Sequence, residues 1–511
     1  MTTADVTLAQ PSLLGFLDKE RTIATAGFNR WLVPPAALCI HLCIGMAYGF
    51  SVFWLPLSRA LGVTQSVACP DLTLGRALFT TTCDWRVADL GWMYTLFFVF
   101  LGSSAALWGG WLERAGPRKA GVVSAFCWCG GIAISAVGVI VHQLWIMWIG
   151  GGVIGGIGLG LGYISPVSTL VKWFPDRRGM ATGMAIMGFG GGAMIGAPLA
   201  NLLMTYFRTP ASVGVWETFL VLAAIYFVFM MAGAFAYRVP AFALRTAGKP
   251  ADEGVHYHDA IKTKQFWLIW AVLCLNVSAG IGVIGMASPM LQEIFGASAA
   301  VAAGFTGLIS LFNIGGRFFW ASLSDHIGRK ATYATFFLLG IALYASAPSL
   351  ARAGSQAAFV LAVCVIVSMY GGGFATIPAY LADTFGTQYV GAIHGRLLTA
   401  WSTAGIIGPV LVNYIREAEL AAGIPRQQVY DVTLYILAGL LVLGLLANAM
   451  VKPLADRHFA PRIHTDSGSR TPDSGRLGLR AALAWTAVGV PLMWGTWVTL
   501  TQAFVLFSGG R

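Results

Sequence analysis

The chain has 511 residues, of which 57% are hydrophobic and only 10% are charged. Soluble proteins carry about 25% charged residues, so this composition excludes an ordinary soluble protein and indicates a polytopic membrane protein. The formal net charge of +11 does not require a nucleic-acid partner, because the basic residues gather mainly in loops on one side of the predicted membrane.

Residues 1–30 contain no apolar core followed by a small-residue cleavage site, so we expect a cytoplasmic tail and not a signal peptide. Lys and Arg concentrate after the even-numbered apolar stretches, which predicts a cytoplasmic N-terminus and an external C-terminus in a cell (inner or plasma) membrane. The stretches long enough to span are 32–57, 89–111, 120–141, 144–171, 180–206, 213–237, 266–291, 299–322, 331–349, 356–381, 392–414, 431–451 and a thirteenth at 481–507.

Two polar gaps divide the chain. Residues 239–264 are expected to form a cytoplasmic linker between two six-helix halves, 31–238 and 265–452. A second cytoplasmic linker at 453–479 leads to an extra transmembrane helix at 480–511.

The cysteines and histidines give little sign of metal chemistry. Six of the eight cysteines lie in apolar stretches, where they are most simply small core residues. Cys69 and Cys83 lie in a polar loop and could pair in an oxidising compartment, which the sequence leaves open. His256 and His258 are too few for a metal site and suit a solvated loop, so we expect no metal ion or other cofactor.

The chain repeats itself at a fixed offset of 212 residues. Glu113 and Asp325 are related in this way, and so are the glycines at 116 and 328 and the prolines at 166 and 378. A single offset held over several helices predicts two parallel repeats, which in transporters place the substrate at their interface near the membrane midplane.

A small residue, an acid, a glycine and a basic pair recur in the turns at 109–119 and 321–330. These turns resemble the loop signature of the major facilitator superfamily. The resemblance implies an all-α membrane protein with the major facilitator fold of two six-helix repeats, to which the apolar stretch at 481–507 adds a thirteenth transmembrane helix. It also implies a conformational latch formed by Glu113, Arg114, Gly116, Asp325, Gly328 and Arg329.

Arg317 is the most unusual residue of the chain. Asp325 marks the point at which this helix leaves the hydrocarbon. Arg317 lies eight residues before it, and therefore about 12 Å inside the membrane. A buried guanidinium costs at least a few kcal/mol and persists only beside a polar cavity or a partner. The repeat offset maps it onto Ala105, which favours a functional role over a purely structural arginine.

The segments 313–320 and 371–386 resemble those of the oxalate/formate antiporter family, which is related to the monocarboxylate transporters. The resemblance covers roughly residues 30–452 and implies that Arg317 anchors a substrate carboxylate. That antiporter carries a lysine in helix 11 as a second cation, whereas this chain has Trp401 at or next to that position. One fixed cation suits a monoanion. The C-terminal segment resembles the small-subunit peptide of some such transporters and is expected to pack outside the bundle.

Further polar and aromatic residues lie well inside the predicted helices, where they could line a substrate cavity. His41 could couple a proton to transport, although a helix-packing histidine is at least as compatible with its position. Asn313 could orient Arg317 or simply join helices. The predicted substrate-binding residues are Arg317, Tyr163, Trp401, His41, Tyr48 and Asn313.

These features predict a secondary active transporter of small carboxylates that works by alternating access as a monomer in membrane lipid. Monocarboxylates such as lactate, pyruvate or formate are favoured, with proton or anion coupling. An oxalate/formate-type anion exchanger is the alternative, followed by a carboxylate-binding membrane sensor. No catalytic set is recognisable, so an enzyme is not expected.

Overall fold

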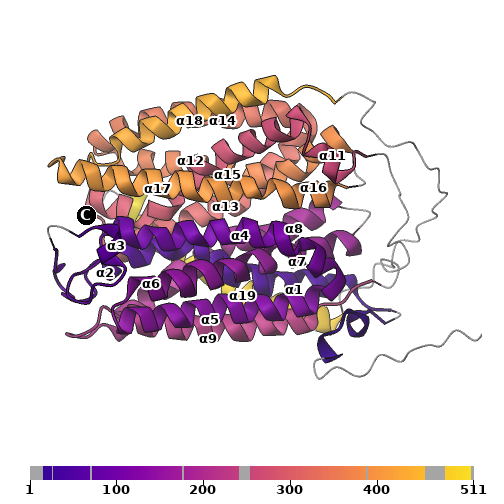
Figure 1. Cartoon of the computed structure of the whole chain (residues 1–511), viewed down its shortest axis with the longest axis horizontal. Coiled ribbons are helices and arrows are strands. Elements are labelled where there is room, and N and C mark those ends of the chain that lie inside the picture. Colours follow the sequence, from indigo (N-terminus) through magenta and orange to yellow (C-terminus); the bar gives the residue numbers. More distant parts are fainter. Residues whose placement is uncertain are drawn as a thin grey trace, which may run out of the picture.

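A computed structural model of the chain describes residues 15–25, 27–69, 72–174, 178–240, 254–386, 389–454 and 478–507. Thirteen helices in these ranges are long and apolar enough to cross a membrane. They run side by side, with the N-terminal half in one layer and the C-terminal half in another (Figure 1). This arrangement confirms the predicted all-α membrane fold and the number of spans.

The N-terminal half comprises α1 (Val33–Ile44), η4 (Gly45–Phe53), α2 (Trp54–Leu57), α3 (Leu74–Ala77), α4 (Val87–Ala115), α5 (Pro117–Ile140), α6 (Leu144–Met147), η5 (Trp148–Gly155), α7 (Gly156–Trp173), α8 (Arg178–Phe207) and α9 (Val215–Ala236). The C-terminal half comprises α11 (Tyr257–Ala260), α12 (Lys264–Phe295), α13 (Ala299–Ile327), α14 (Arg329–Arg352), α15 (Gln356–Phe385), α16 (Val390–Leu397), α17 (Thr399–Ala421) and α18 (Asp431–Met450), and is followed by α19 (Leu479–Phe507).

The bundle has two distinct ends. We call the end that carries residues 58–86 the loop end, and the end at which α9 and α18 finish the linker end (Figure 1). At the loop end, Cys69 and Cys83 are joined by a disulfide, which resolves the question that the sequence left open. The carboxylate of Asp84 accepts hydrogen bonds from three backbone amides of this loop, at residues 61, 62 and 67. The loop is therefore internally cross-linked.

The two halves repeat each other closely. The first and last residues of α4 are 212 positions before those of α13, and the same offset relates α5 to α14. Gly116 and Gly328 occupy equivalent turns, and each has a φ of 86°, a left-handed value that favours glycine. The repeat inferred from the sequence is thus present in the backbone.

Several predicted spans are interrupted helices. The first span passes from α1 into the 3₁₀ segment η4, and the eleventh breaks between α16 and α17. η4 packs tightly on α8, since a Cβ at Gly45 would lie 2.4 Å from the carbonyl oxygen of Phe189. Glycine at this position therefore lets the first span approach the α8 backbone.

Candidate functional site

Arg317 lies between the two halves. Its side chain is only 1% exposed, and its Nε donates a hydrogen bond of 3.0 Å to Oδ1 of Asn313. Gly190 of α8 makes room for it, because a Cβ there would lie 2.9 Å from Nε. Within the described part of the chain, Nη1 and Nη2 make no hydrogen bond of regular geometry, although the hydroxyls of Tyr48 and Tyr163 face the guanidinium and interact with it.

Seven aromatic side chains surround this position, and we call them the aromatic cage: Tyr48, Phe98, Tyr163, Phe189, Tyr370, Phe374 and Trp401. All are 2% exposed or less. They come from η4, α4, α7, α8, α15 and α17, so both halves contribute. The guanidinium carbon of Arg317 lies 5.7 Å from the ring centroid of Phe374, which allows a cation–π interaction.

Trp401 is at the centre of the cage. Its ring centroid lies 4.4 Å from that of Phe374, 5.2 Å from that of Tyr163 and 5.5 Å from that of Phe189. Its indole Nε1 and the hydroxyl of Tyr163 are buried without a hydrogen-bond partner among the described residues. The cage therefore holds unpaired donors in addition to those of Arg317.

Tyr48 and Tyr370 close the cage across the two halves. Their hydroxyl groups lie 2.7 Å apart and share a hydrogen bond. The sequence analysis singled out Tyr48 but missed Tyr370. Tyr370 lies near the middle of α15, directly before the glycines 371–373, and therefore deep in the membrane. Its distance from the helix ends could have identified it in the same way as Arg317.

His41 lies behind the cage, inside the N-terminal half. Its Nε2 is 3.1 Å from the backbone carbonyl oxygen of Tyr163, and its ring stacks on the Tyr163 ring at 5.6 Å. The ring also contacts Phe189 edge-on at 6.4 Å. These contacts are those of a helix-packing histidine, so His41 can influence the cage through its aromatic neighbours.

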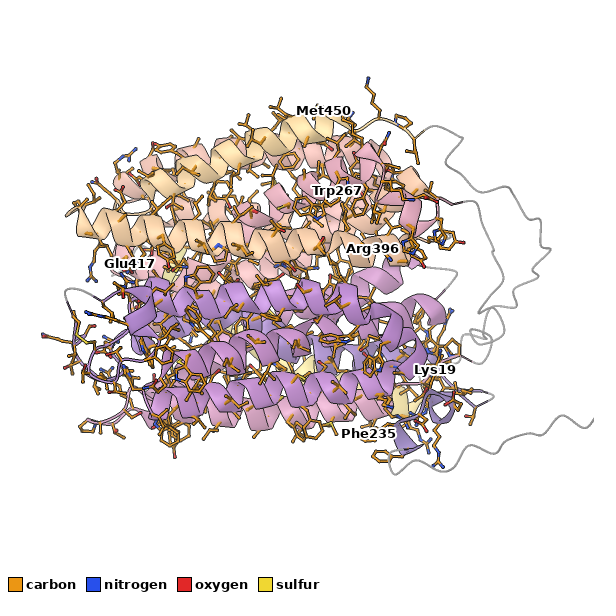
Figure 2. All side chains as sticks on the ribbon, in the orientation of Figure 1. Lys19, Phe235, Trp267, Arg396, Glu417 and Met450 are labelled. Carbon is orange, nitrogen blue, oxygen red and sulfur yellow. A yellow bond between two sulfur atoms is a disulfide. The ribbon has the colours of Figure 1, made fainter. Side chains whose placement is uncertain are left out.

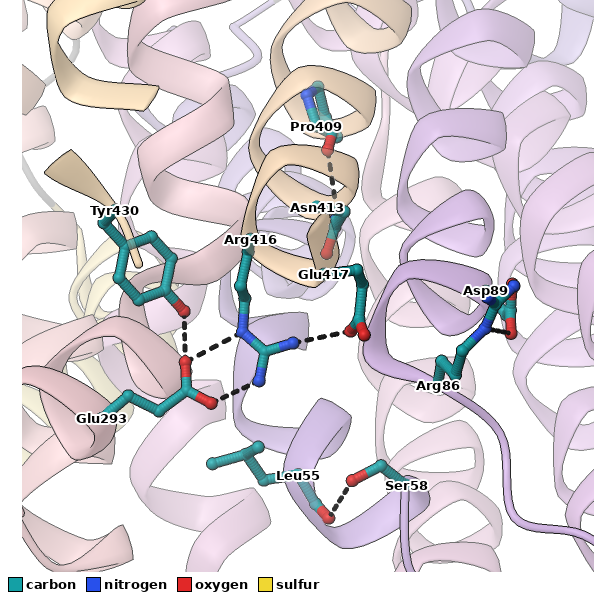
Figure 3. Close-up of polar contacts among 10 residues, drawn as sticks. All are labelled: Leu55, Ser58, Arg86, Asp89, Glu293, Pro409, Asn413, Arg416, Glu417 and Tyr430. Carbon is teal, nitrogen blue, oxygen red and sulfur yellow. Dashed lines mark hydrogen bonds and ion pairs between the residues drawn. The ribbon is translucent and has the colours of Figure 1, made fainter. Parts of the chain in front are cut away.

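A second polar cluster, which the sequence did not predict, lies at the loop end (Figure 3). The side chains of Arg416 and Glu293 are 5% and 3% exposed and form a two-point ion pair, in which Nε donates to the carboxylate at 2.9 Å. Arg416 Nη1 also donates to Glu417 at 2.7 Å, and the Tyr430 hydroxyl donates to Glu293 at 2.6 Å. Arg416 is therefore neutralised, unlike Arg317.

The loop end is closed by contacts between the halves. Pro289 has no N–H, so the carbonyl of Gly285 cannot make its helical bond, and Trp54 Nε1 donates to it at 2.8 Å. Trp92 Nε1 donates to the Tyr414 hydroxyl at 2.9 Å. In each of these two hydrogen bonds the donor belongs to the N-terminal half and the acceptor to the C-terminal half. Opening of the loop end therefore requires both bonds to break.

The predicted latch residues lie at the linker end. Arg329 hydrogen-bonds to Ser324 and Asp325, and its Nε is 3.4 Å from a carboxylate oxygen of Asp383 in α15. The side chains of Glu113 and Arg114 lie outside the described residues.

Arg396 also lies toward the linker end, and Glu417 marks the opposite end (Figure 2). The guanidinium of Arg396 lies 4.3 Å from the ring centroid of Tyr257, which is not a residue of the cage. His256 and His258 form ring contacts there, and the residues with described positions include no group of three or more metal-binding side chains.

Proteins similar to this chain along most of their length include an antiporter and a carrier. The oxalate:formate antiporter of Oxalobacter formigenes is 26% identical over 388 residues, which cover 74% of this chain and 83% of that protein. Apicoplast pyruvate carrier 1 of Toxoplasma gondii is 24% identical over 457 residues, covering 73% of this chain and 81% of that protein.

The fold has a solved counterpart. The crystal structure of a D-xylose–proton symporter covers 83% of this chain and 98% of its own, with a TM-score of 0.61 at 15% sequence identity. At this identity the likeness concerns the fold alone. Residues 36–409 match the profile of the Major Facilitator Superfamily, and the chain therefore belongs to that superfamily.

Proposed function

We propose that this protein is a secondary active transporter of small carboxylates, with monocarboxylates such as lactate, pyruvate or formate favoured. The observation that carries the proposal is the buried guanidinium of Arg317, whose Nη1 and Nη2 make no hydrogen bond of regular geometry among the described residues and face the hydroxyls of Tyr48 and Tyr163. A planar guanidinium binds the two oxygens of a carboxylate in parallel and stays charged at any physiological pH. A small carboxylate would therefore satisfy donors that are otherwise costly to bury.

The cage supplies the remaining recognition. The Tyr163 hydroxyl and Trp401 Nε1 can each donate a hydrogen bond to the anion, while the aromatic faces contact a short apolar chain. Trp401 stands at or next to the position where the resemblance predicts a second cation, and the described cage contains one cation only. This charge balance favours a monoanion over oxalate.

Transport follows by alternating access between the two halves. The Tyr48–Tyr370 bond and the Trp54–Gly285 bond join the halves on the loop side of the bundle. Rocking of the halves would break these bonds and expose Arg317 to the loop end. We further propose that the linker end faces the cytoplasm, that the latch residues stabilise that end, and that a proton or a counter-anion supplies the coupling.

The test is uptake of labelled lactate, pyruvate, formate and oxalate into proteoliposomes. Arg317→Ala and Arg317→Lys should both lower uptake at least tenfold, because lysine keeps the charge but loses the planar fork. Arg396→Ala is the matched control and should retain uptake. Unchanged uptake by Arg317→Ala would refute the anchor role. Faster uptake of oxalate than of any monocarboxylate would favour the exchanger of the oxalate/formate type.

A further inference from the structure

α19 lies along the seam between the two halves, where it packs against α8 of the first half and α13 of the second. It is the most exposed of the thirteen candidate spans, because only 22% of the residues in its apolar stretch are buried. It therefore lies outside the bundle, as expected from the sequence. Its buried residues form one stripe along the helix: Ala481, Val488, Gly495, Thr499, Ala503 and Leu506.

Glycines bring α19 unusually close to both neighbours. A Cβ at Gly307 of α13 would lie 2.3 Å from Oγ1 of Thr499, and a Cβ at Gly495 would lie 2.8 Å from Cγ1 of Ile195 in α8. Small residues at such contacts let membrane helices approach backbone to backbone. The seam therefore fits a transmembrane helix at this register.

Thr499 uses its hydroxyl differently from the other threonines described in α19. Thr486, Thr496 and Thr501 each donate to the carbonyl four residues earlier in their own helix, and Thr496 also reaches Sδ of Met194 in α8 at 3.4 Å. Thr499 instead donates across the interface, to the carbonyl oxygen of Met194 in α8 at 3.1 Å, and its side chain is fully buried.

The acceptor is a carbonyl that α8 itself cannot satisfy. Pro198 lies four residues after Met194 inside α8 and has no N–H, so the helical bond to the Met194 carbonyl is missing. In a membrane, a carbonyl without a partner is costly because no water replaces the lost bond. Thr499 supplies the donor that Pro198 removed.

A second hydroxyl enters the same stretch of α8 from the other half. Ser310 Oγ of α13 donates to the carbonyl of Gly190 and accepts from the backbone N–H of Met194 at 3.2 Å. The Gly190 carbonyl and the Met194 N–H are the two groups that pair with each other in a regular helix, so the Ser310 hydroxyl bridges one step of the α8 hydrogen-bond ladder. Gly190 is also the residue that makes room for Arg317. The backbone beside the guanidinium thus depends on hydroxyls from α13 and α19.

We propose that α19 is a built-in accessory helix, docked on the α8–α13 seam, and that Thr499 is the positioning residue through which it holds the interrupted segment of α8 beside Arg317. Thr499 does not touch the substrate. It sets the α8 backbone that must move relative to α13 when the halves rock, so its transport consequence rests on the function proposed above.

The test compares five variants of the full chain in proteoliposomes: Thr499→Val, Thr499→Ser, Thr501→Val, Pro198→Ala and the double variant with Pro198→Ala and Thr499→Val. Thr499→Val should lower the maximal uptake rate about tenfold, the size expected when one buried carbonyl loses its partner, with the half-saturation concentration unchanged. Thr499→Ser, which keeps the hydroxyl, should restore the rate. Thr501→Val, the same change on the exposed side of α19, should have no effect. Pro198→Ala returns the missing N–H, so adding Thr499→Val to it should change the rate little.

A wild-type rate in Thr499→Val, or an equal loss in the presence and absence of Pro198→Ala, would overturn the inference. The same cycle is measured by thermal unfolding in detergent, which needs no substrate. Coupling between positions 198 and 499 in unfolding, without uptake of any carboxylate, would refute the carrier proposal and retain the role of α19. Carboxylate uptake without coupling between positions 198 and 499 would support the carrier proposal and refute the proposed role of Thr499.

Discussion

The hydroxyl groups of Tyr48 and Tyr370 meet at 2.7 Å, and they join the two halves of the protein beside its buried cation. Tyr48 comes from η4 and Tyr370 from the middle of α15. Each ring is also part of the aromatic cage, so the bond links the substrate position to the arrangement of the halves. A bond of this kind exists only while the halves are together on the loop side of the cage.

Tyr370→Phe should therefore shift the protein toward conformations that are open at the loop end. Loss of one buried hydrogen bond costs about 1 kcal/mol, which changes a two-state population roughly fivefold. The measurement is the rate at which a thiol reagent labels Ser288→Cys, a buried site between the halves, in a background without the six free cysteines. Labelling should become about fivefold faster.

Tyr344→Phe is the control for this experiment. The Tyr344 hydroxyl donates to the carbonyl of Ala279 at 2.8 Å, entirely within the C-terminal half. Its loss should leave the labelling rate unchanged. Equal acceleration by both variants would mean that general loosening, and not separation of the halves, exposes position 288.

The fold was largely predictable because its determinants are local or periodic. Span length, loop charge and the 212-residue offset each depend on residue type and spacing alone, and the bounds of α4 and α13 reproduce that offset. Arg317 was found in the same way, since a charge in an apolar stretch has few tolerated explanations.

The parts that were missed depend on contacts between distant residues. Glu293 and Arg416 are 123 residues apart, and each alone is an unremarkable charge near a helix end. Thr499 donates to the Met194 carbonyl of another helix, which Pro198 of that helix leaves without its helical N–H partner. No proline lies at the break between α16 and α17, so the sequence contains no helix-breaking residue that predicts it. Sequence spacing carries none of this information.

Trp401→Lys should move substrate preference toward dianions. A lysine at this position would place a second cation in the cage, and a close charge pair in a buried site is worth enough to change relative affinity about tenfold or more. The measurement is inhibition of uptake by unlabelled oxalate and formate, expressed as a ratio. Trp401→Phe keeps the cage neutral and should retain the original ratio. The charge argument fails if both variants change the ratio equally.

Removal of one partner from the Glu293–Arg416 pair should destabilise the protein strongly. Glu293→Ala removes the two-point partner of a guanidinium whose side chain is 5% exposed and leaves it only the bond to Glu417, so the cost should lie near the lower end of the about 3–5 kcal/mol typical of an uncompensated buried charge. Thermal unfolding in detergent measures the effect. Asp259→Ala removes an exposed partner of Lys262 and should cost almost nothing. The double variant with Arg416→Met should recover part of the loss, and strictly additive losses would contradict a direct pairing.

The packing of the loop end should weaken in mild acid through His142. This residue lies between α5 and α6, its ring stacks on Trp85 at 3.9 Å, and its Nε2 is 2.9 Å from the carbonyl of Cys83. Burial lowers the pKa of His142 below its ordinary value of about 6.5, although the Cys83 carbonyl and Asp84 oppose the change. The unfolded loop therefore binds a proton before the folded loop does. The stabilising contribution is complete above about pH 6.5 and is lost as the pH falls through the lower, folded-state pKa.

The measurement for this prediction is the unfolding midpoint, or the amide exchange of residues 58–86, between pH 7.5 and 5. His142→Asn is a suitable comparison, since His142 has a φ of 51° and asparagine tolerates that left-handed backbone. The wild-type protein should lose stability relative to this variant as the pH falls, because only the wild type must protonate a buried imidazole. Parallel pH profiles for the two proteins would assign the acid sensitivity of the loop to other groups.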